Sequence, residues 1–286
     1  MPSQPLITSR QKPGLSLLQW SILGLTLLAL YYSVLITWIS DLWHDDNYSH
    51  GLLIPFLSLY FIRERMPAIK EAACRPYFPA AALVVLSLLF YILGYVGSEF
   101  FTQRISFILL LYSCIFFLSG KALEKQLRLP VLILFFAVPL PYILYNSVAF
   151  PLKLWASRLA VILIALTGRP VFADGNVIHL THTTLEVVDA CSGIRSLMTL
   201  FTLAFFLAYF FADCFWKRVL IFSLTLPITL TANALRVTAT AVLTSYDPAW
   251  GEGFRHELTG WLVFVLSFVA LAGVALLLRP KQKTKM

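Results

Sequence analysis

The sequence predicts an all-α membrane protein that crosses the bilayer about eight times, with one interfacial helix and a small β-hairpin outside the membrane. Three observations predict this fold class. Hydrophobic residues make up 59% of the 286 residues and charged residues only 13%, which is outside the usage of soluble proteins. Several uncharged stretches reach the roughly 20 residues that a helix needs to cross a bilayer. Basic residues gather between alternate stretches.

Eight largely uncharged stretches are the expected membrane-spanning helices. Four are long enough by themselves: residues 13–40, 76–98, 129–152 and 258–278. Three are shorter, but an arginine at the boundary can reach toward the headgroups and extend the helix: residues 105–120, 196–212 and 219–235. The eighth stretch, residues 51–62, follows the polar sequence HDDNYSH. We interpret it as a brief span that begins at about Asn47, and a re-entrant segment is the alternative.

The basic residues orient the chain. Most of the 22 Lys and Arg residues lie near the chain ends or in alternate loops, and most of the 14 acidic residues lie in the other loops. Because Lys and Arg accumulate in cytoplasmic loops, we expect both termini and residues 63–75 inside, and residues 169–190 outside. The net charge of +8 then belongs to the cytoplasmic rim and gives no support for nucleic-acid binding.

Residues 148–168, VAFPLKLWASRLAVILIALTG, allow two interpretations. As a further span, this segment would reverse the side on which the following residues lie. Lys153 and Arg158 flank Trp155, and only ten uncharged residues separate Arg158 from Arg169. These features favour an amphipathic helix that lies in the outer interface.

The next segment differs in pattern from the rest of the chain. In residues 169–190, apolar and polar residues alternate around the turn signals DGN and HTT, which predicts a small β-hairpin. Strands with open edges are excluded from the hydrocarbon, so the hairpin is expected on the outer surface. We interpret residues 1–286 as one integral membrane domain with this hairpin as an insertion.

Cys191 lies where the hairpin ends and the sixth span begins. In TLEVVDACSGIRSL, Asp189 or Ser192 can cap the helix and Gly193 permits a sharp entry. The unpaired N–H groups and the dipole at a helix start favour a thiolate, so a reactive cysteine is physically credible. A cysteine that only packs is the alternative.

Two further candidates lie at the outer ends of the last two spans. Seventeen uncharged residues precede Arg236, and an arginine at this depth needs a partner, water or a function. Asn233 and Thr240 share its helix face, while a structural salt bridge is the alternative. His256 can exchange protons near neutral pH, although the other four histidines, His50 among them, compete for that role.

The motifs ACSGIRSL, NALRVT and HELTGWLVF occur in this order, after NYSHGLLIP at residues 47–55. Together they resemble the exosortase family, membrane cysteine transpeptidases related to archaeosortases, over essentially the whole chain. The resemblance implies that Cys191 is the nucleophile, with Arg236 and His256 as its catalytic partners. It also implies a bacterial cytoplasmic membrane with the site facing the periplasm. The implied partners, besides membrane lipids, are exported proteins with a C-terminal PEP-CTERM-like tail: a Pro-Glu-Pro-type motif, a transmembrane helix and a basic cluster.

The chemistry expected of these groups is thiolate attack on a peptide carbonyl, followed by a thioester that an amine or water resolves. His256 would protonate the leaving amine and then deprotonate the second nucleophile. Arg236 would stabilise the thiolate or the oxyanion. The possible supporting residues are Arg195, which is the alternative for the electrostatic role, Asp189, Asn233 and His50. We expect no cofactor and no metal, because the histidines and cysteines lack zinc-type spacing.

Two other classes of function remain as alternatives. A transporter is expected to have paired broken helices near the midplane and an internal repeat, and neither is found in the sequence. A membrane acyl- or glycosyltransferase would be centred on the acids and histidine of DLWHDD at residues 41–46. Substitution of Cys191 by Ala would separate these classes from a cysteine enzyme.

Overall fold

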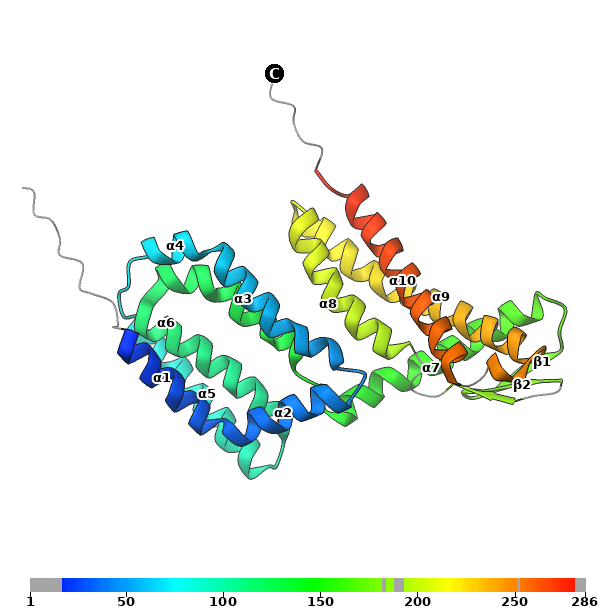
Figure 1. The fold of residues 1–286 in the computed structure, drawn as a ribbon, viewed down its shortest axis with the longest axis horizontal. Helices are drawn as coiled ribbons and strands as arrows, with labels where there is room; N and C mark the ends of the chain where they lie inside the picture. Colours follow the sequence, from blue (N-terminus) through cyan, green and yellow to red (C-terminus); the bar gives the residue numbers. More distant parts are fainter. Residues whose placement is uncertain (1–16, 182–183, 188–192, 251–252, 281–286) are drawn as a thin grey trace, which may run out of the picture. The chain divides into compact units, whose positions relative to one another are not determined.

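The computed structural model describes residues 17–181, 184–187, 193–250 and 253–280 (Figure 1). The chain divides into two compact units, an N-terminal unit of residues 1–140 and a C-terminal unit of residues 141–286. Helices dominate both units, and the C-terminal unit also contains a small antiparallel sheet.

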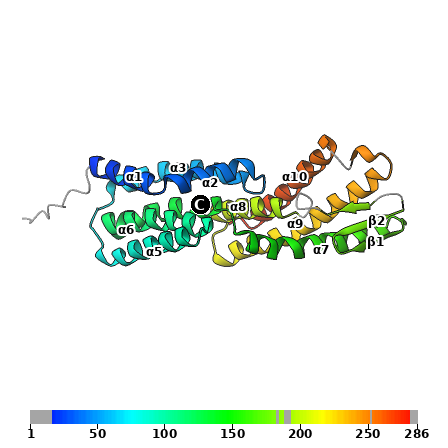
Figure 2. The ribbon, with the colours of Figure 1, turned by 90° about the horizontal axis from the view of Figure 1, so that it is seen from below.

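The N-terminal unit consists of helices, with α1 to α3 in one layer and α5 and α6 in another (Figure 2). The core centres on Tyr31, whose ring is fully buried against Leu27, Val34 and Leu110 and whose hydroxyl lies 3.0 Å from Ser106 Oγ. The elements in order are α1 (Leu17–Leu30), α2 (Tyr32–His44), η1 (Ser49–Leu53), α3 (Ile54–Glu64), α4 (Met66–Glu71), η2 (Phe78–Ala80), α5 (Ala81–Val96), α6 (Phe100–Leu132) and η3 (Ile133–Ala137).

Helix α6 bends sharply at Gly120, whose φ of 77° is non-helical. The N–H groups of Arg75 and Tyr77 donate to carbonyls of the turn before the bend, at 3.1 and 2.8 Å. A Cβ at Gly120 would lie 2.0 Å from the Arg75 carbonyl oxygen, so only glycine fits there. The bend falls where the expected span 105–120 ends.

The C-terminal unit combines three long helices with α7 and the sheet. Small side chains, Ala204 on α8 and Ala275 on α10, allow these helices to pack closely around Leu200, Ile221 and Leu271. The elements in order are α7 (Tyr142–Ala165), β1 (Val171–Asp174), β2 (Val177–Leu180), β3 (Thr184–Glu186), α8 (Ile194–Phe211), α9 (Phe215–Thr244), η5 (Pro248–Trp250) and α10 (Gly253–Leu277).

The small antiparallel sheet predicted between residues 169 and 190 is confirmed, and it has three strands in the order β1-β2-β3. The sheet lies beside α7 and α9 (Figure 2). Ile178 and Val187 pack against Ile164 of α7 and Val237 of α9, and all four side chains are buried. The sheet is thereby fixed to α7 and α9, whereas the side of the membrane on which it lies stays a prediction.

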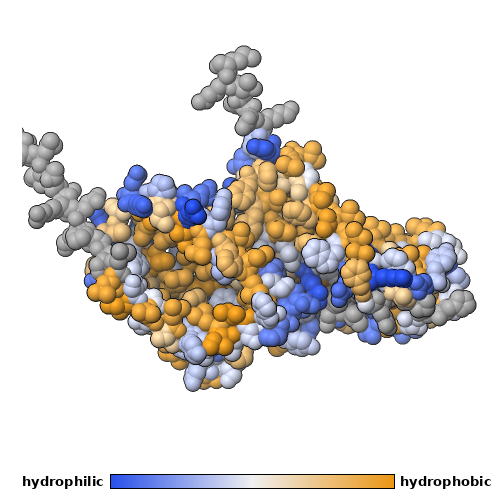
Figure 3. All heavy atoms as spheres, viewed as in Figure 1, coloured by the Kyte–Doolittle hydropathy of each residue, from blue (hydrophilic) through white to orange (hydrophobic). Residues whose placement is uncertain are grey.

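Six segments of the described chain are long and apolar enough to cross a membrane: Phe78–Val96, Phe100–Ala137, Tyr142–Ala165, Ile194–Phe211, Phe215–Thr244 and Gly253–Leu277. Helices α1 and α2, bent by 70°, add a seventh if they form one broken span. Figure 3 shows hydrophobic side chains along α10, where Trp261, Leu262 and Leu266 are exposed, as expected for a helix in contact with lipid. The expected count of eight spans is not confirmed.

The structure differs from three expectations about the helices. The span at residues 129–152 is not one helix, because the chain is non-helical at residues 138–141, where Pro139 and Pro141 lack N–H groups and restrict the residues before them. Residues 51–62 are not among the candidate spans, since η1 and the following α3 are together shorter than the helices that could cross a membrane. The segment 148–168 belongs mostly to α7, whose 24 residues begin at Tyr142 and are long and apolar enough to cross a membrane.

Candidate active site

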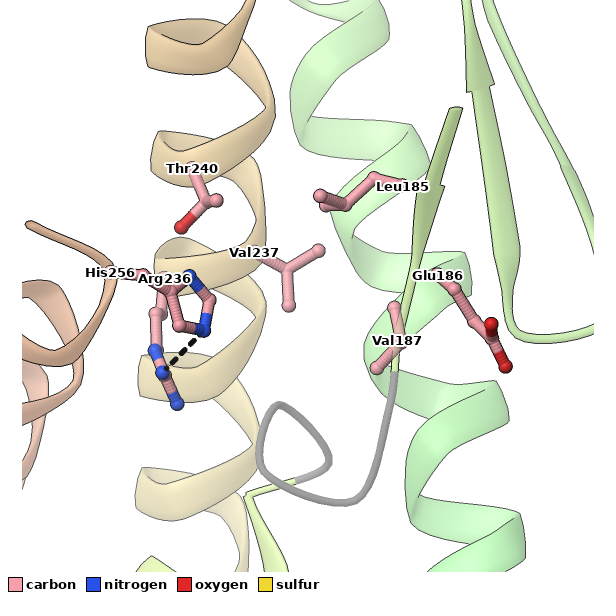
Figure 4. A pocket seen from close by; sticks show the side chains of 7 residues that line it. All are labelled: Leu185, Glu186, Val187, Arg236, Val237, Thr240 and His256. Carbon is pink, nitrogen blue, oxygen red and sulfur yellow. Dashed lines mark hydrogen bonds between the residues drawn. The ribbon is translucent and has the colours of Figure 1, made fainter. Parts of the chain in front are cut away.

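Arg236 and His256 meet in the C-terminal unit (Figure 4). Arg236 extends from α9 and His256 from the first turns of α10, and Arg236 Nη2 lies 3.1 Å from His256 Nε2. A guanidinium can only donate, so His256 Nε2 accepts this hydrogen bond and carries no proton. Both side chains are partly exposed. The pair therefore combines a permanent cation with a neutral imidazole that can accept a proton.

The loop between α9 and α10 fixes the start of α10 and with it His256. Asp247 accepts hydrogen bonds from the Ala249 N–H at 3.0 Å and from Arg255 Nη1 at 2.5 Å. Both hydrogen bonds lower the pKa of Asp247, and the bond from the Ala249 N–H has the larger effect. The Arg255 guanidinium also lies over the Trp250 ring, 5.4 Å from its centroid. Arg255, which directly precedes His256, is thus held by the Asp247 carboxylate and by the Trp250 ring.

The guanidinium of Arg236 packs against Gly260, which has no side chain. Gly260 lies one helical turn after His256 on α10, and a Cβ there would lie 3.0 Å from both Cζ and Nη2 of Arg236. Contacts this short force a neighbouring group to move. The absence of a side chain at Gly260 lets the guanidinium lie against the backbone of α10.

A pocket opens beside the pair. It is small, and its lining residues are Leu185, Glu186, Val187, Arg236, Val237, Thr240 and His256. Figure 4 shows Leu185 and Val187 of the sheet directed toward α9, with Glu186 directed away. The pocket therefore has a sheet wall and a helix wall, and the cation and the imidazole belong to the helix wall.

The beginning of α8 contacts α9 one turn before Arg236. Gly193 is buried with a φ of 79°, and a Cβ there would lie 3.0 Å from Cβ and Cγ of Asn233. Asn233 is itself only 4% exposed. Both the close approach and the left-handed conformation require glycine at position 193.

The structure brings together part of the predicted site. Arg236 and His256 pair, and Asn233 lies on the same helix one turn earlier. Arg195 lies in the first turn of α8, whereas Cys191 and Asp189 lie outside the described residues.

His50 belongs to the N-terminal unit, in η1. Burial lowers the pKa of its imidazole, against a hydrogen bond with the backbone of Phe136 that raises it. Within the described ranges, no group of three His, Cys, Asp or Glu residues is arranged to hold a metal ion. Gly260 and the residues of β3 were not predicted as parts of the site. A glycine one turn after the histidine in HELTG was the available signal for Gly260.

Long apolar helices together with a guanidinium–imidazole pair beside a pocket define a multi-pass membrane protein with a candidate catalytic site. The family model described as Transmembrane exosortase (Exosortase_EpsH) matches residues 38–273, and the chain therefore belongs to the exosortase family. Searches of curated proteins and of solved structures gave no significant match. Family membership supports a role in membrane protein sorting or transpeptidation in general.

Proposed function

We propose that this protein is a cysteine protease-transpeptidase that recognises and cleaves C-terminal PEP-CTERM-like sorting signals of exported proteins. The observation that carries the proposal is the Arg236–His256 pair beside a pocket that Val187, four residues before Cys191, also lines. Membership of the exosortase family supports the same class of reaction.

The chain on both sides of Cys191 is held near the pair. Val187, four residues before Cys191, lines the pocket with Arg236 and His256. Gly193, two residues after it, approaches Asn233. Consecutive Cα atoms are about 3.8 Å apart, so covalent geometry keeps the Cα atom of Cys191 within about 7.6 Å of that of Gly193.

The proposed reaction begins when His256 accepts the proton of the Cys191 thiol. The thiolate then forms a C–S bond with the peptide carbonyl carbon, and the C=O electron pair moves to oxygen. When this oxyanion collapses, the C–N bond breaks and the leaving amine takes the proton from His256, which leaves a thioester. A second amine or water then attacks the thioester, gives up a proton to His256, and releases the thiolate.

Arg236 supplies positive charge and directed donors where the thiolate and the oxyanion form. One well-placed donor to an oxyanion contributes roughly 3–4 kcal/mol to the stability of the transition state. When His256 Nε2 accepts the thiol proton, its hydrogen bond from Arg236 must break, and the released Arg236 donor can then turn to the thiolate or the oxyanion.

The acids of the N-terminal unit do not favour a transferase site. Asp41 forms an ion pair with the buried Arg104, and Asp45 Oδ1 accepts hydrogen bonds from the backbone and side chain of Asn47. Asp41 and Asp45 are therefore engaged in structural contacts of the unit.

The proposed site faces the outside of a bacterial cytoplasmic membrane. Single cysteines introduced at Asn176, in the turn between β1 and β2, and at Lys70, in α4, test this orientation in a background without other cysteines. We expect a membrane-impermeant thiol reagent added to intact cells to label the cysteine at position 176 and not that at position 70. The reverse pattern would contradict the orientation.

The test of the chemistry is cleavage by Cys191→Ala. We expect this variant to accumulate in membranes but to lose cleavage of a tailed substrate by at least about a thousandfold, because no other group supplies the thioester. Cys214→Ala is the matched control, since Cys214 is a free and exposed thiol. Cleavage at the wild-type rate by Cys191→Ala would exclude the cysteine mechanism.

A further inference from the structure

We propose that the pocket beside Arg236 and His256 is a peptide-binding subsite, in which an extended substrate segment pairs with the free edge of β3 and accepts a hydrogen bond from Thr240. This inference rests on the proposed function, because it describes how the same site takes its peptide. Two independent features carry it, the backbone of β3 and a buried hydroxyl on α9.

The first feature is the outer edge of β3. In the described part of the chain, β3 pairs with β2 alone. The Val187 N–H donates to the Asn176 carbonyl at 2.8 Å. Residues of an antiparallel strand alternate between bonding toward the partner and away from it, so Leu185 also bonds toward β2. The backbone N–H and C=O groups of Thr184 and Glu186 consequently point away from β2, where a further strand can pair with them.

This edge belongs to the pocket. Glu186 and Val187 line it together with Arg236 and His256, and Figure 4 shows β3 facing the helix that carries Arg236. A strand advances about 3.3 Å per residue. A peptide that pairs with Glu186 therefore needs only a few residues to reach the cation and the imidazole.

The second feature is Thr240, one turn after Arg236 on α9. Its side chain lines the pocket and is only 2% exposed, and its Oγ1 makes no hydrogen bond to any described residue. Figure 4 shows this hydroxyl directed toward His256 and Arg236. Thr238 on the same helix instead bonds the Ala234 carbonyl at 2.8 Å. Since a buried hydroxyl without a partner is costly, the Thr240 hydroxyl indicates a ligand that supplies an acceptor.

An extended peptide satisfies both features. Its alternating N–H and C=O groups match the outward backbone groups of Thr184 and Glu186, and one of its carbonyls can accept from Thr240. The Pro-Glu-Pro-type motif of the proposed substrate is compatible with this mode of binding. Residues two apart in a strand face the same side, so the two prolines, which lack N–H groups, can face outward while the glutamate between them pairs with β3.

The test of Thr240 uses the full-length enzyme in detergent and a substrate with the motif, a transmembrane helix and a basic cluster. Thr240→Val keeps the shape of the side chain and removes the hydroxyl, so we expect KM to rise at least about fivefold, with kcat within about twofold. Thr240→Ser restores the hydroxyl and should recover most of the loss. Thr238→Val is the matched control and should cleave as the wild type does, because that hydroxyl already has a partner within its own helix.

The test of β3 compares two substitutions at Glu186. Glu186→Ala removes the side chain and keeps the N–H, whereas Glu186→Pro also removes the outward N–H without breaking the ladder to β2. We expect the KM of Glu186→Pro to be at least about three times the KM of Glu186→Ala. Should that variant fail to fold, the Thr240 series decides by itself.

The outcomes separate this inference from the proposed function. A wild-type enzyme that does not cleave the tailed substrate contradicts the proposed function. A wild type that cleaves, together with an unchanged KM in folded Thr240→Val, overturns the peptide subsite alone. An equal KM for folded Glu186→Pro and for Glu186→Ala would also overturn the peptide subsite.

Discussion

Each of the two compact units contains an arginine within an apolar helix, but the surroundings of the two differ. Arg104 in α6 is 3% exposed, lies over the Phe100 ring and forms an ion pair with Asp41. Arg236 in α9 is partly exposed, donates to the neutral His256 and lines a pocket. The N-terminal arginine is packed against a counter-charge, whereas the C-terminal arginine pairs with an imidazole at the wall of a small pocket.

This difference indicates which cation has a structural role. An arginine in an apolar environment costs free energy, and a carboxylate offsets part of that cost without providing a function. A guanidinium that shares a bond with an imidazole at the wall of a pocket can instead direct its donors to a reacting group. The two arginines should therefore respond oppositely when stability and cleavage are measured separately.

The largest effect is expected for Arg236→Met. Loss of the guanidinium should lower cleavage per folded molecule at least about 100-fold, equivalent to about 2.7 kcal/mol of transition-state stabilisation. Arg104→Met is the matched variant, and it should cleave normally per folded molecule. Normal cleavage by Arg236→Met would show that both arginines are structural.

The next effect concerns stability. Asp41→Asn leaves the buried Arg104 without its carboxylate, and we expect a loss of about 2 kcal/mol in the free energy of unfolding. This is less than for a fully buried pair, because the Asp41 side chain is 52% exposed. Cleavage per folded molecule should not change. The double variant Asp41→Asn with Arg104→Met should recover part of the loss, and a double variant less stable than Asp41→Asn would contradict the ion-pair explanation.

The sequence predicts several of the long apolar helices and the pairing of Arg236 with His256. Four expected spans, at residues 76–98, 196–212, 219–235 and 258–278, correspond to candidate spans of the structure. In each case the hydrophobic run is long or is bounded by a charged residue. The meeting of Arg236 with His256 could be anticipated because both lie near the same ends of neighbouring helices.

The sequence is less informative where breaks lie inside apolar runs. Hydropathy joined residues 129 to 152 into one span, although Pro139 and Pro141 interrupt the helix between α6 and α7. The same pattern hides the beginning of α7 at Tyr142, so residues 148–168 resemble an interfacial segment. Long-range contacts are also hidden, since no local pattern reveals that β3 lines the pocket beside Arg236.

A smaller effect is expected from a substitution that keeps the charge. Arg236→Lys retains a cation but lacks the planar fork of donors, so cleavage should fall at least about tenfold, equivalent to about 1.4 kcal/mol. Arg195→Lys, in the first turn of α8, is the control, and we expect it to reduce cleavage less. Near-normal cleavage by Arg236→Lys together with loss in Arg195→Lys would transfer the electrostatic role to Arg195. The rates are normalised to the amount of enzyme in detergent-extracted membranes.

The smallest effect is expected at Gly260, where the geometry of the Arg236–His256 pair is tested with both groups retained. A Cβ at this position would lie 3.0 Å from the guanidinium, so Gly260→Ala must displace Arg236 from His256 by a few tenths of an ångström. We expect cleavage to fall about fivefold, equivalent to about 1 kcal/mol, with little change in KM. Gly273→Ala on the same helix is the matched control, because nothing lies within 4 Å of its Cβ position. It should cleave normally and gain roughly 0.5–1 kcal/mol of stability from the higher helix propensity of alanine. Equal cleavage by the two alanine variants would show that the pair tolerates the displacement and that its contact geometry does not limit the reaction.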